Sequence, residues 1–141
     1  MEARDLRLED IAVGDTASFE RTIHESDIAT FSELSGDRNP LHTDAAYAAH
    51  TRFGRPIVHG MLLGILCSAL VGMHLPGKRC LYLGQTLRFK KPVYAGDRVV
   101  VAGTVWSISP ATRVLTIGVS IRRTEEEVAA GEAQVQVLQY A

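Results

Sequence analysis

Apolar and polar positions follow different patterns in the two halves of the chain. Residues 60–74 are apolar on every side of a helix, which predicts a helix enclosed by protein rather than one on a surface. In the second half, apolar residues occupy alternate positions, the period-two pattern of a half-buried strand, as at Leu115, Ile117, Val119 and Ile121. The sequence therefore predicts one buried helix combined with strands.

Turn and cap signals divide the rest of the sequence. Ser26 is the expected N-cap of a helix that runs to about residue 34, with Gly36 just past its end. Pro40 lacks a backbone donor and biases Asn39 to an extended conformation, so residues 37–42 are predicted to form a non-helical loop. A short helix over 45–49, capped by Thr43 or Asp44, should follow. We expect strands over residues 16–23, 80–89, 98–107 and 113–123, and a last one after the acidic turn at 125–127.

These elements imply an α+β architecture, a curved antiparallel sheet around the buried helix. The length of 141 residues fits one domain, residues 1–141. Such a sheet leaves open edges, which a stable protein must cover or pair. Edge pairing in a homodimer is the simplest way to do so.

Composition excludes several classes of protein. Apolar residues make up 46% and charged residues 22%, as in ordinary globular proteins, and the net charge of −1 argues against nucleic-acid binding. Neither Cys67 nor Cys80 lies in a C-x-x-C pair, so both are expected to be reduced and packed, as in a cytoplasmic protein. The apolar run 57–73 approaches the length of a membrane span, but Pro56, Gly60 and Pro76 bound it closely, and no membrane contact is expected.

The loop between Gly36 and Thr43 is the first candidate site. It carries a carboxylate, Asp37, and an imidazole, His42, which together can orient a water molecule and move its proton. The spacing alone leaves another interpretation open, in which Asp37 ends the helix in an Asx turn and His42 caps or packs.

The start of the buried helix is the second candidate. The first N–H groups of a helix have no internal acceptor, and Gly60 has no side chain, so a substrate carbonyl could approach its N–H as in an oxyanion hole. A glycine required only for tight packing would look the same.

Three segments together resemble a known family. Residues 31–44 (FSELSGDRNPLHTD), 52–62 (RFGRPIVHGML) and 89–97 (FKKPVYAGD) are similar to sequence blocks of the MaoC-like (R)-specific enoyl-CoA hydratases, in the same order. The resemblance extends over roughly residues 15–140. It implies a hot-dog fold, in which a curved antiparallel sheet wraps a long central helix.

The resemblance also implies a site. It places the catalytic pair on Asp37 and His42, the oxyanion donor on the N–H of Gly60, and a helix serine near the carboxylate on Ser68. A helix serine is also commonly bonded to its own preceding turn. Asn39 is expected to contact the substrate. Two basic groups are expected to hold the substrate's phosphates: Arg52 and Arg55, and Arg88, Lys90 and Lys91. Either group could instead be solvated surface charge.

The implied reaction is hydration of a trans-2-enoyl thioester to a (3R)-hydroxyacyl thioester, or its reverse. The carrier is coenzyme A or an acyl-carrier protein, coenzyme A being part of the substrate, and no cofactor is required. No metal site is expected, because the histidines show no ligand-pair spacing such as H-x-x-x-H.

Two other functions remain open. A hot-dog thioesterase also needs a carboxylate and an oxyanion donor but attacks the carbonyl carbon, and the D-x-N-P-x-H loop favours hydration instead. A non-catalytic acyl-binding module would not need the pair Asp37 and His42.

Overall fold

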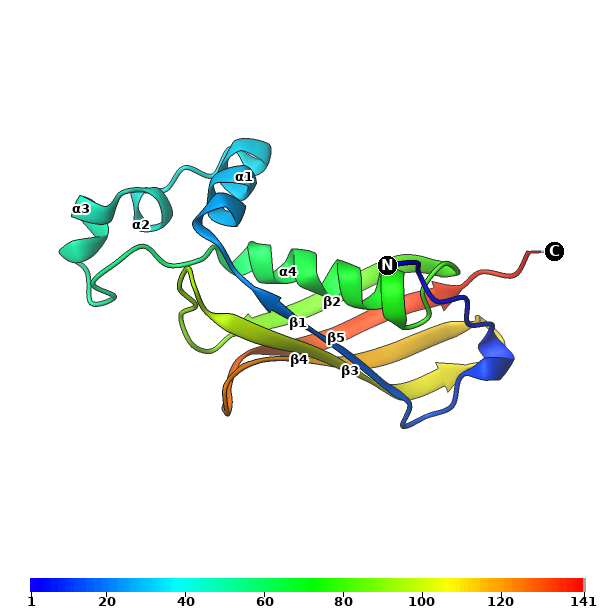
Figure 1. Cartoon of the computed structure of the whole chain (residues 1–141). Helices are drawn as coiled ribbons and strands as arrows, with labels where there is room; N and C mark the ends of the chain where they lie inside the picture. Colours follow the sequence, from blue (N-terminus) through cyan, green and yellow to red (C-terminus); the bar gives the residue numbers. More distant parts are fainter. Residues whose placement is uncertain (141) are drawn as a thin grey trace.

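One curved antiparallel sheet forms the body of the molecule (Figure 1). The computed structural model describes residues 1–140. The strands β1 (Thr16–Thr22), β2 (Cys80–Phe89), β3 (Arg98–Ser109), β4 (Val114–Arg123) and β5 (Glu126–Val137) pair in the order β1-β3-β4-β5-β2. The helix α4 (Gly60–Ala69) lies across one face and continues as a π-helical turn over Leu70–His74. The predicted α+β hot-dog arrangement is confirmed, with the strands close to their predicted bounds.

Three short helices project beyond one end of α4, at the opposite end from the chain termini (Figure 1). They are α1 (Glu25–Ser35), α2 (Pro40–Thr43) and α3 (Ala45–Ala49); a 3-10 turn over Leu8–Asp10 lies near the N-terminus. Gly36 ends α1 in the left-handed conformation, with φ 80°, as predicted. The predicted N-cap at Ser26 is wrong: the N-cap is His24, two residues earlier, and its N–H donates to the Asp27 carboxylate at 2.8 Å.

The segment predicted to be non-helical contains a helical turn. Pro40 stands at the first position of α2, where a missing N–H costs nothing, and Asn39 caps the turn by accepting the N–H of Leu41 at 2.9 Å. The prediction treated proline as a helix breaker and overlooked its suitability for the first position. Asp44 caps α3, accepting the N–H of Tyr47 at 3.1 Å.

The core lies between α4 and the concave face of the sheet. The side of α4 that faces the sheet is buried, and it meets the alternate inward residues of the strands, such as Val101, Ile117 and Val135. β3 has a glycine opposite the end of this helix: a Cβ at Gly103 would come within 2.9 Å of the Leu70 side chain. The absence of that side chain lets helix and sheet approach closely.

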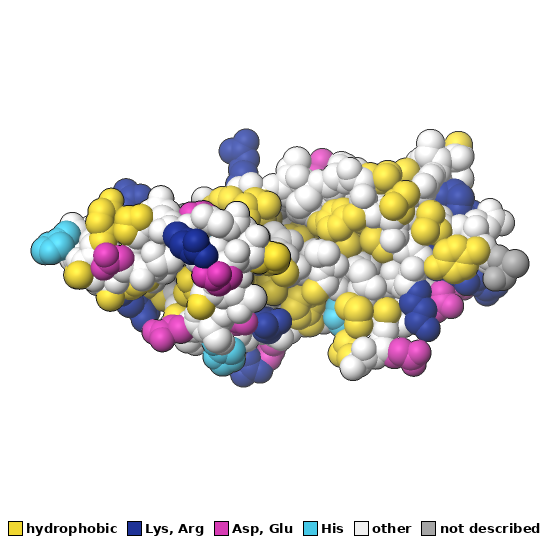
Figure 2. Space-filling model, turned by 90° about the horizontal axis from the view of Figure 1, so that it is seen from above, with side chains coloured by type: hydrophobic (Ala, Val, Ile, Leu, Met, Phe, Trp, Pro, Cys, Tyr) yellow, Lys and Arg dark blue, Asp and Glu magenta, His cyan; other side chains and the backbone are white. Residues whose placement is uncertain are grey.

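The other side of α4 is open in the single chain. Met61 is 63% and Ile65 48% exposed, and Ser68, on the same helical face, is exposed too. Figure 2 shows hydrophobic side chains gathered over the middle of this face. The prediction of a fully enclosed helix is therefore wrong for one chain. No helix within residues 1–140 combines the length and hydropathy needed to cross a membrane.

The two cysteines should be unreactive in the folded protein. Both are free thiols, Cys67 buried in α4 and Cys80 half-buried in β2, and burial raises the pKa of each to about 11. At pH 8 only about one thiol in a thousand is then the reactive thiolate. We expect a thiol reagent to label neither residue at pH 8 until denaturant unfolds the chain. Stoichiometric labelling under native conditions would contradict this.

Candidate active site

The loop after α1 is folded by its own short side chains. The carboxylate of Asp37 accepts the N–H of Asn39 at 3.1 Å, directly before the Asn39 cap of α2. These two turns reverse the chain within a few residues. As a result, the Asp37 carboxylate and the His42 ring lie in one cluster, with ligand-type atoms within 4.8 Å of one another. The structure thus brings together the predicted pair, and the Asx turn at Asp37 is present as well.

The ring of His42 has a defined orientation. Its Nδ1 lies 2.8 Å from the carbonyl oxygen of Ile57, in the segment that leads into α4. A carbonyl can only accept a hydrogen bond, so Nδ1 carries the hydrogen and Nε2 of the neutral ring has the free lone pair. This tautomer leaves Nε2 available to accept a proton from water.

The oxyanion candidate lies on the same side. Gly60 is the first residue of α4, and no hydrogen bond within residues 1–140 uses its N–H. A cavity of about 310 Å³ is lined by both His42 and Gly60, with Leu63, Phe89 and Val93 forming further walls. A carbonyl oxygen bound there could accept a hydrogen bond from the N–H of Gly60. The carbon chain attached to that carbonyl would then lie near His42, the member of the Asp37–His42 pair that lines the cavity.

Comparison with known proteins places this chain in a family. The model of the MaoC like domain family matches residues 11–127. The chain belongs to the MaoC-like domain family. It is 44% identical to an (R)-specific enoyl-CoA hydratase of Aeromonas caviae, over 84% of this chain and 93% of the relative.

Two further proteins are similar to this chain over most of their length. The 3-hydroxybutyryl-CoA dehydratase of Methylorubrum extorquens is 40% identical, over 96% of this chain and 87% of its own. Among solved structures, the unliganded R-hydratase PhaJ1 of Pseudomonas aeruginosa superposes with a TM-score of 0.91 at 37% identity, covering 99% of this chain and 94% of that one.

His59 is the residue of this MaoC-like domain that sequence reasoning missed. It is 2% exposed, and its ring centroid lies 4.0 Å from that of His42, with the rings stacked. Its Nε2 lies 3.1 Å from the carbonyl oxygen of Asp37. Burial lowers the pKa of His59 below the ordinary value. The available signal was a histidine directly before Gly60 inside an apolar run, where a polar side chain must find a partner.

Two predicted site residues have other positions. Ser68 is exposed on α4, about 12 Å along the helix axis from Gly60. The structure therefore does not bring Ser68 to the Asp37–His42 pair within one chain. The side-chain oxygen of Asn39 caps α2 and so has a structural role there.

The predicted basic groups of the MaoC-like domain are divided between surfaces. Arg52, Lys90 and Lys91 all line the cavity at Gly60. The guanidinium of Arg52 also lies over the ring of Phe53. Arg55 lies over Tyr94, 4.2 Å from the ring centroid, and lines a second hollow that also reaches His42.

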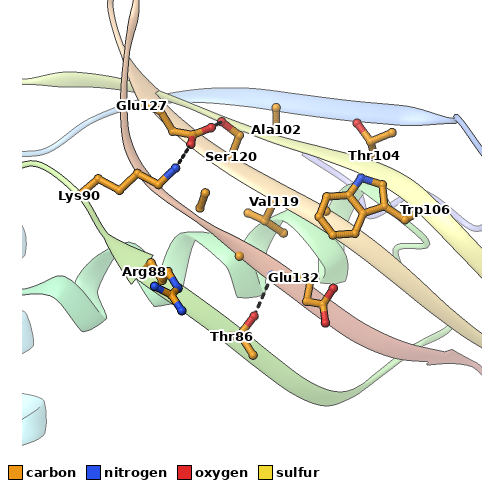
Figure 3. A pocket seen from close by; sticks show the side chains of 13 residues that line it. Thr86, Arg88, Lys90, Ala102, Thr104, Trp106, Val119, Ser120, Glu127 and Glu132 are labelled. Carbon is orange, nitrogen blue, oxygen red and sulfur yellow. Dashed lines mark hydrogen bonds and ion pairs between the residues drawn. The ribbon is translucent and has the colours of Figure 1, made fainter.

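Arg88 and Lys90 also line a hollow of about 540 Å³ on the opposite face of the sheet (Figure 3). There Lys90 pairs with Glu127, and the pKa of Glu127 is lowered by Lys90 and Ser120. Trp106 covers Gly118 at the other end of this hollow, and α4 lies behind the sheet. Arg88 thus points away from the candidate active site.

Asp37, His42 and His59 could be considered as metal ligands because their ligand atoms lie within 4.8 Å. The geometry does not fit one ion well. The two rings are stacked, so their lone pairs run side by side instead of converging, and His42 Nδ1 and His59 Nε2 are already at hydrogen-bond distance from backbone carbonyls. We therefore derive the chemistry from the protein groups alone.

Proposed function

We propose that this MaoC-like domain hydrates trans-2-enoyl-CoA to (3R)-hydroxyacyl-CoA and catalyses the reverse dehydration. One observation carries the proposal: Asp37 lies in one cluster with His42, and His42 lines a cavity together with Gly60, the residue with an unused helix-start N–H. The names of the relatives, an (R)-specific enoyl-CoA hydratase and a 3-hydroxybutyryl-CoA dehydratase, support the same reaction and its stereochemistry.

The reaction follows from these three groups. Water held between the Asp37 carboxylate and Nε2 of His42 attacks C3 of the enoyl chain, and the pair takes one of its protons. The π electrons of the C2–C3 bond move toward the thioester, whose oxygen gains negative charge next to the N–H of Gly60. The proton returned to C2 completes the addition of one water molecule. No electrons are exchanged, so we propose that no cofactor takes part. The two free thiols, Cys67 and Cys80, support the further proposal that the protein is cytoplasmic.

A direct assay tests the reaction. With crotonyl-CoA we expect loss of the enoyl absorbance without release of free thiol. Thiol release would indicate a thioesterase, and binding without either change would indicate an acyl-binding module. Either of these results would overturn the proposal. Chiral analysis of the product would check the (3R) configuration.

The carrier is proposed to bind at the mouth of the cavity at Gly60. Arg52 and Lys91 are exposed cations there, although Lys91 also lies 3.8 Å from Glu126. The phosphates of coenzyme A, or of the phosphopantetheine arm of an acyl-carrier protein, carry the matching negative charge. The same cations serve both carriers, so comparing crotonyl-CoA with a crotonyl carrier protein would distinguish them.

We propose a homodimer because a single chain leaves an apolar helix face exposed and two strand edges without a neighbouring strand. The exposed face of α4 contains Met61, Ile65 and Ser68, and β1 and β2 are the two edges of the sheet. A second copy that covered both helix and edge would bury this apolar stripe and pair an edge. Such an arrangement would also bring Ser68 near another chain.

Replacing Ile65 with Glu should weaken this dimer. Ile65 is 48% exposed, so the change introduces no charge into the core of the single chain, but it places one in the proposed interface. We expect light scattering at micromolar concentration to show a dimer for the wild type and a shift toward monomer for Ile65→Glu. Val13→Glu, at another exposed apolar residue, is the control. A wild-type chain that is an active monomer would refute the dimer.

Acyl-chain length should be limited by the cavity. The family resemblance suggests a preference for about four to eight carbons, and each buried CH₂ then contributes about 0.8 kcal/mol only until the tail meets packed protein. Kinetics with enoyl-CoA substrates of increasing length measure this. Activity that rises steadily to the longest chains would contradict the prediction.

A further inference from the structure

The proposed reaction makes no use of His59, although this side chain contacts both His42 and the backbone of Asp37. Its ring stacks on His42 and also packs against Phe31, with a centroid distance of 4.5 Å. Its Nε2 lies 3.1 Å from the Asp37 carbonyl oxygen and 3.3 Å from the hydroxyl of Ser32. Its backbone forms the N-cap of α4, directly before Gly60.

The hydrogen-bond partners define the tautomer of His59. The carbonyl oxygen of Asp37 can only accept, so Nε2 must carry the hydrogen, with the Ser32 hydroxyl as a second acceptor. Nδ1 is buried and has no hydrogen-bond partner within residues 1–140. A proton on Nδ1 would therefore find no acceptor, so the neutral ring is the form that fits, and burial favours the same form by lowering the pKa of His59.

A buried nitrogen without a partner is unfavourable for folding. An aromatic hydrocarbon such as phenylalanine, only one ring atom larger, would avoid that cost. The stack on His42 and the tilted contact with Phe31 do not require a nitrogen either. The part of the ring that a phenylalanine cannot replace is the Nε2 hydrogen, which reaches the backbone of the loop that carries Asp37.

We propose that His59 is a positioning residue, a neutral imidazole whose Nε2–H fixes the Asp37 loop while its ring face fixes the plane of His42. This inference rests on the proposed hydratase function. In this arrangement one side chain sets the distance between the two catalytic groups and ties both to the start of α4. Because His59 remains neutral, the adjacent His42 can gain and lose a proton without a second charge beside it.

His59→Phe tests the role directly. The variant keeps an aromatic ring between His42 and Phe31 and removes the Nε2 hydrogen and the unpaired Nδ1. We expect kcat for crotonyl-CoA to fall about 10- to 100-fold, as for a small misplacement of catalytic groups, with KM nearly unchanged. Tm should stay close to that of the wild type, because removal of the unpaired Nδ1 offsets the loss of the two contacts of Nε2. His59→Gln, which retains an N–H donor, should recover part of the loss.

His74→Phe is the matched control. His74 also stacks on an aromatic ring, that of Phe19, at a centroid distance of 5.4 Å, but it lies in the π-helical turn away from the site. The same substitution there should change kcat by less than about twofold. If His59→Phe keeps wild-type kcat, or if it loses Tm and kcat together and His59→Gln recovers neither, the positioning role is refuted.

A measurement on the unmodified protein does not depend on how the variants fold. Long-range ¹H–¹⁵N correlation spectra of the imidazole rings should show hydrogen on Nε2 of His59 and on Nδ1 of His42. A hydrogen on Nδ1 of His59 at neutral pH would refute the proposal. The wild-type assay with crotonyl-CoA separates the two claims: if the wild type has no hydratase activity, the proposed function fails, whatever the tautomer of His59.

Discussion

Turnover of crotonyl-CoA is expected to fall about 100-fold or more when either Asp37 or His42 loses its acid–base group, the usual effect of removing such a group. Asp37→Asn is the sharpest change because the amide oxygen can still accept the N–H of Asn39. His42→Asn likewise retains a donor, because its amide nitrogen occupies the position of Nδ1, the atom that reaches the Ile57 carbonyl. Both variants should therefore keep the loop conformation and lose the proton transfer.

The control for this pair is His50→Ala. His50 is exposed at the end of α3, outside the cluster of Asp37, His42 and His59, and its loss should leave turnover nearly unchanged. Circular dichroism and Tm of all three variants should match the wild type. A folded Asp37→Asn or His42→Asn variant with wild-type turnover would remove that residue from the mechanism.

Most of the fold could be predicted because its signals are local and periodic. Alternation over 115–121 determines which face of β4 is buried, and a helix apolar on all sides must be covered by something. The sequence could not indicate that the Met61 and Ile65 side of α4 is left exposed in a single chain. A helix face that the same chain buries and one that a second copy would bury both need apolar residues, so the two cases have the same sequence pattern.

The candidate site was predictable in part. The loop from Gly36 to His42 shows its chemistry in the sequence, since a carboxylate and an imidazole flank a proline-stiffened turn. The role of His59 depends on a ring stack and on a backbone carbonyl 22 positions earlier in the chain, and neither leaves a local pattern. Arg88 lies on the outer face of the sheet because side chains alternate along a strand, which directs it away from α4. Its closeness in sequence to Lys90 and Lys91 suggested a shared site and did not take this alternation into account.

The Gly60 N–H can be tested apart from the glycine itself. A Cβ at this position would come within 2.8–3.0 Å of the Phe89 ring, so Gly60→Ala alone combines a steric clash with any effect on the oxyanion. Phe89→Ala removes the ring that causes the clash. On this background, Gly60→Ala retains the N–H and should have turnover close to that of Phe89→Ala.

Gly60→Pro on the same background removes the N–H itself. Proline is well accommodated at the first position of a helix, and His59 already has the extended conformation that a residue before proline requires, φ −58° and ψ 136°. The helix should therefore be retained while the donor is lost. Turnover should fall about 10²- to 10³-fold relative to the Ala double variant, as when one oxyanion-hole donor is removed. Equal turnover of the two double variants, with equal Tm, would mean that the thioester oxygen is stabilised elsewhere and that Gly60 serves only to make room for Phe89.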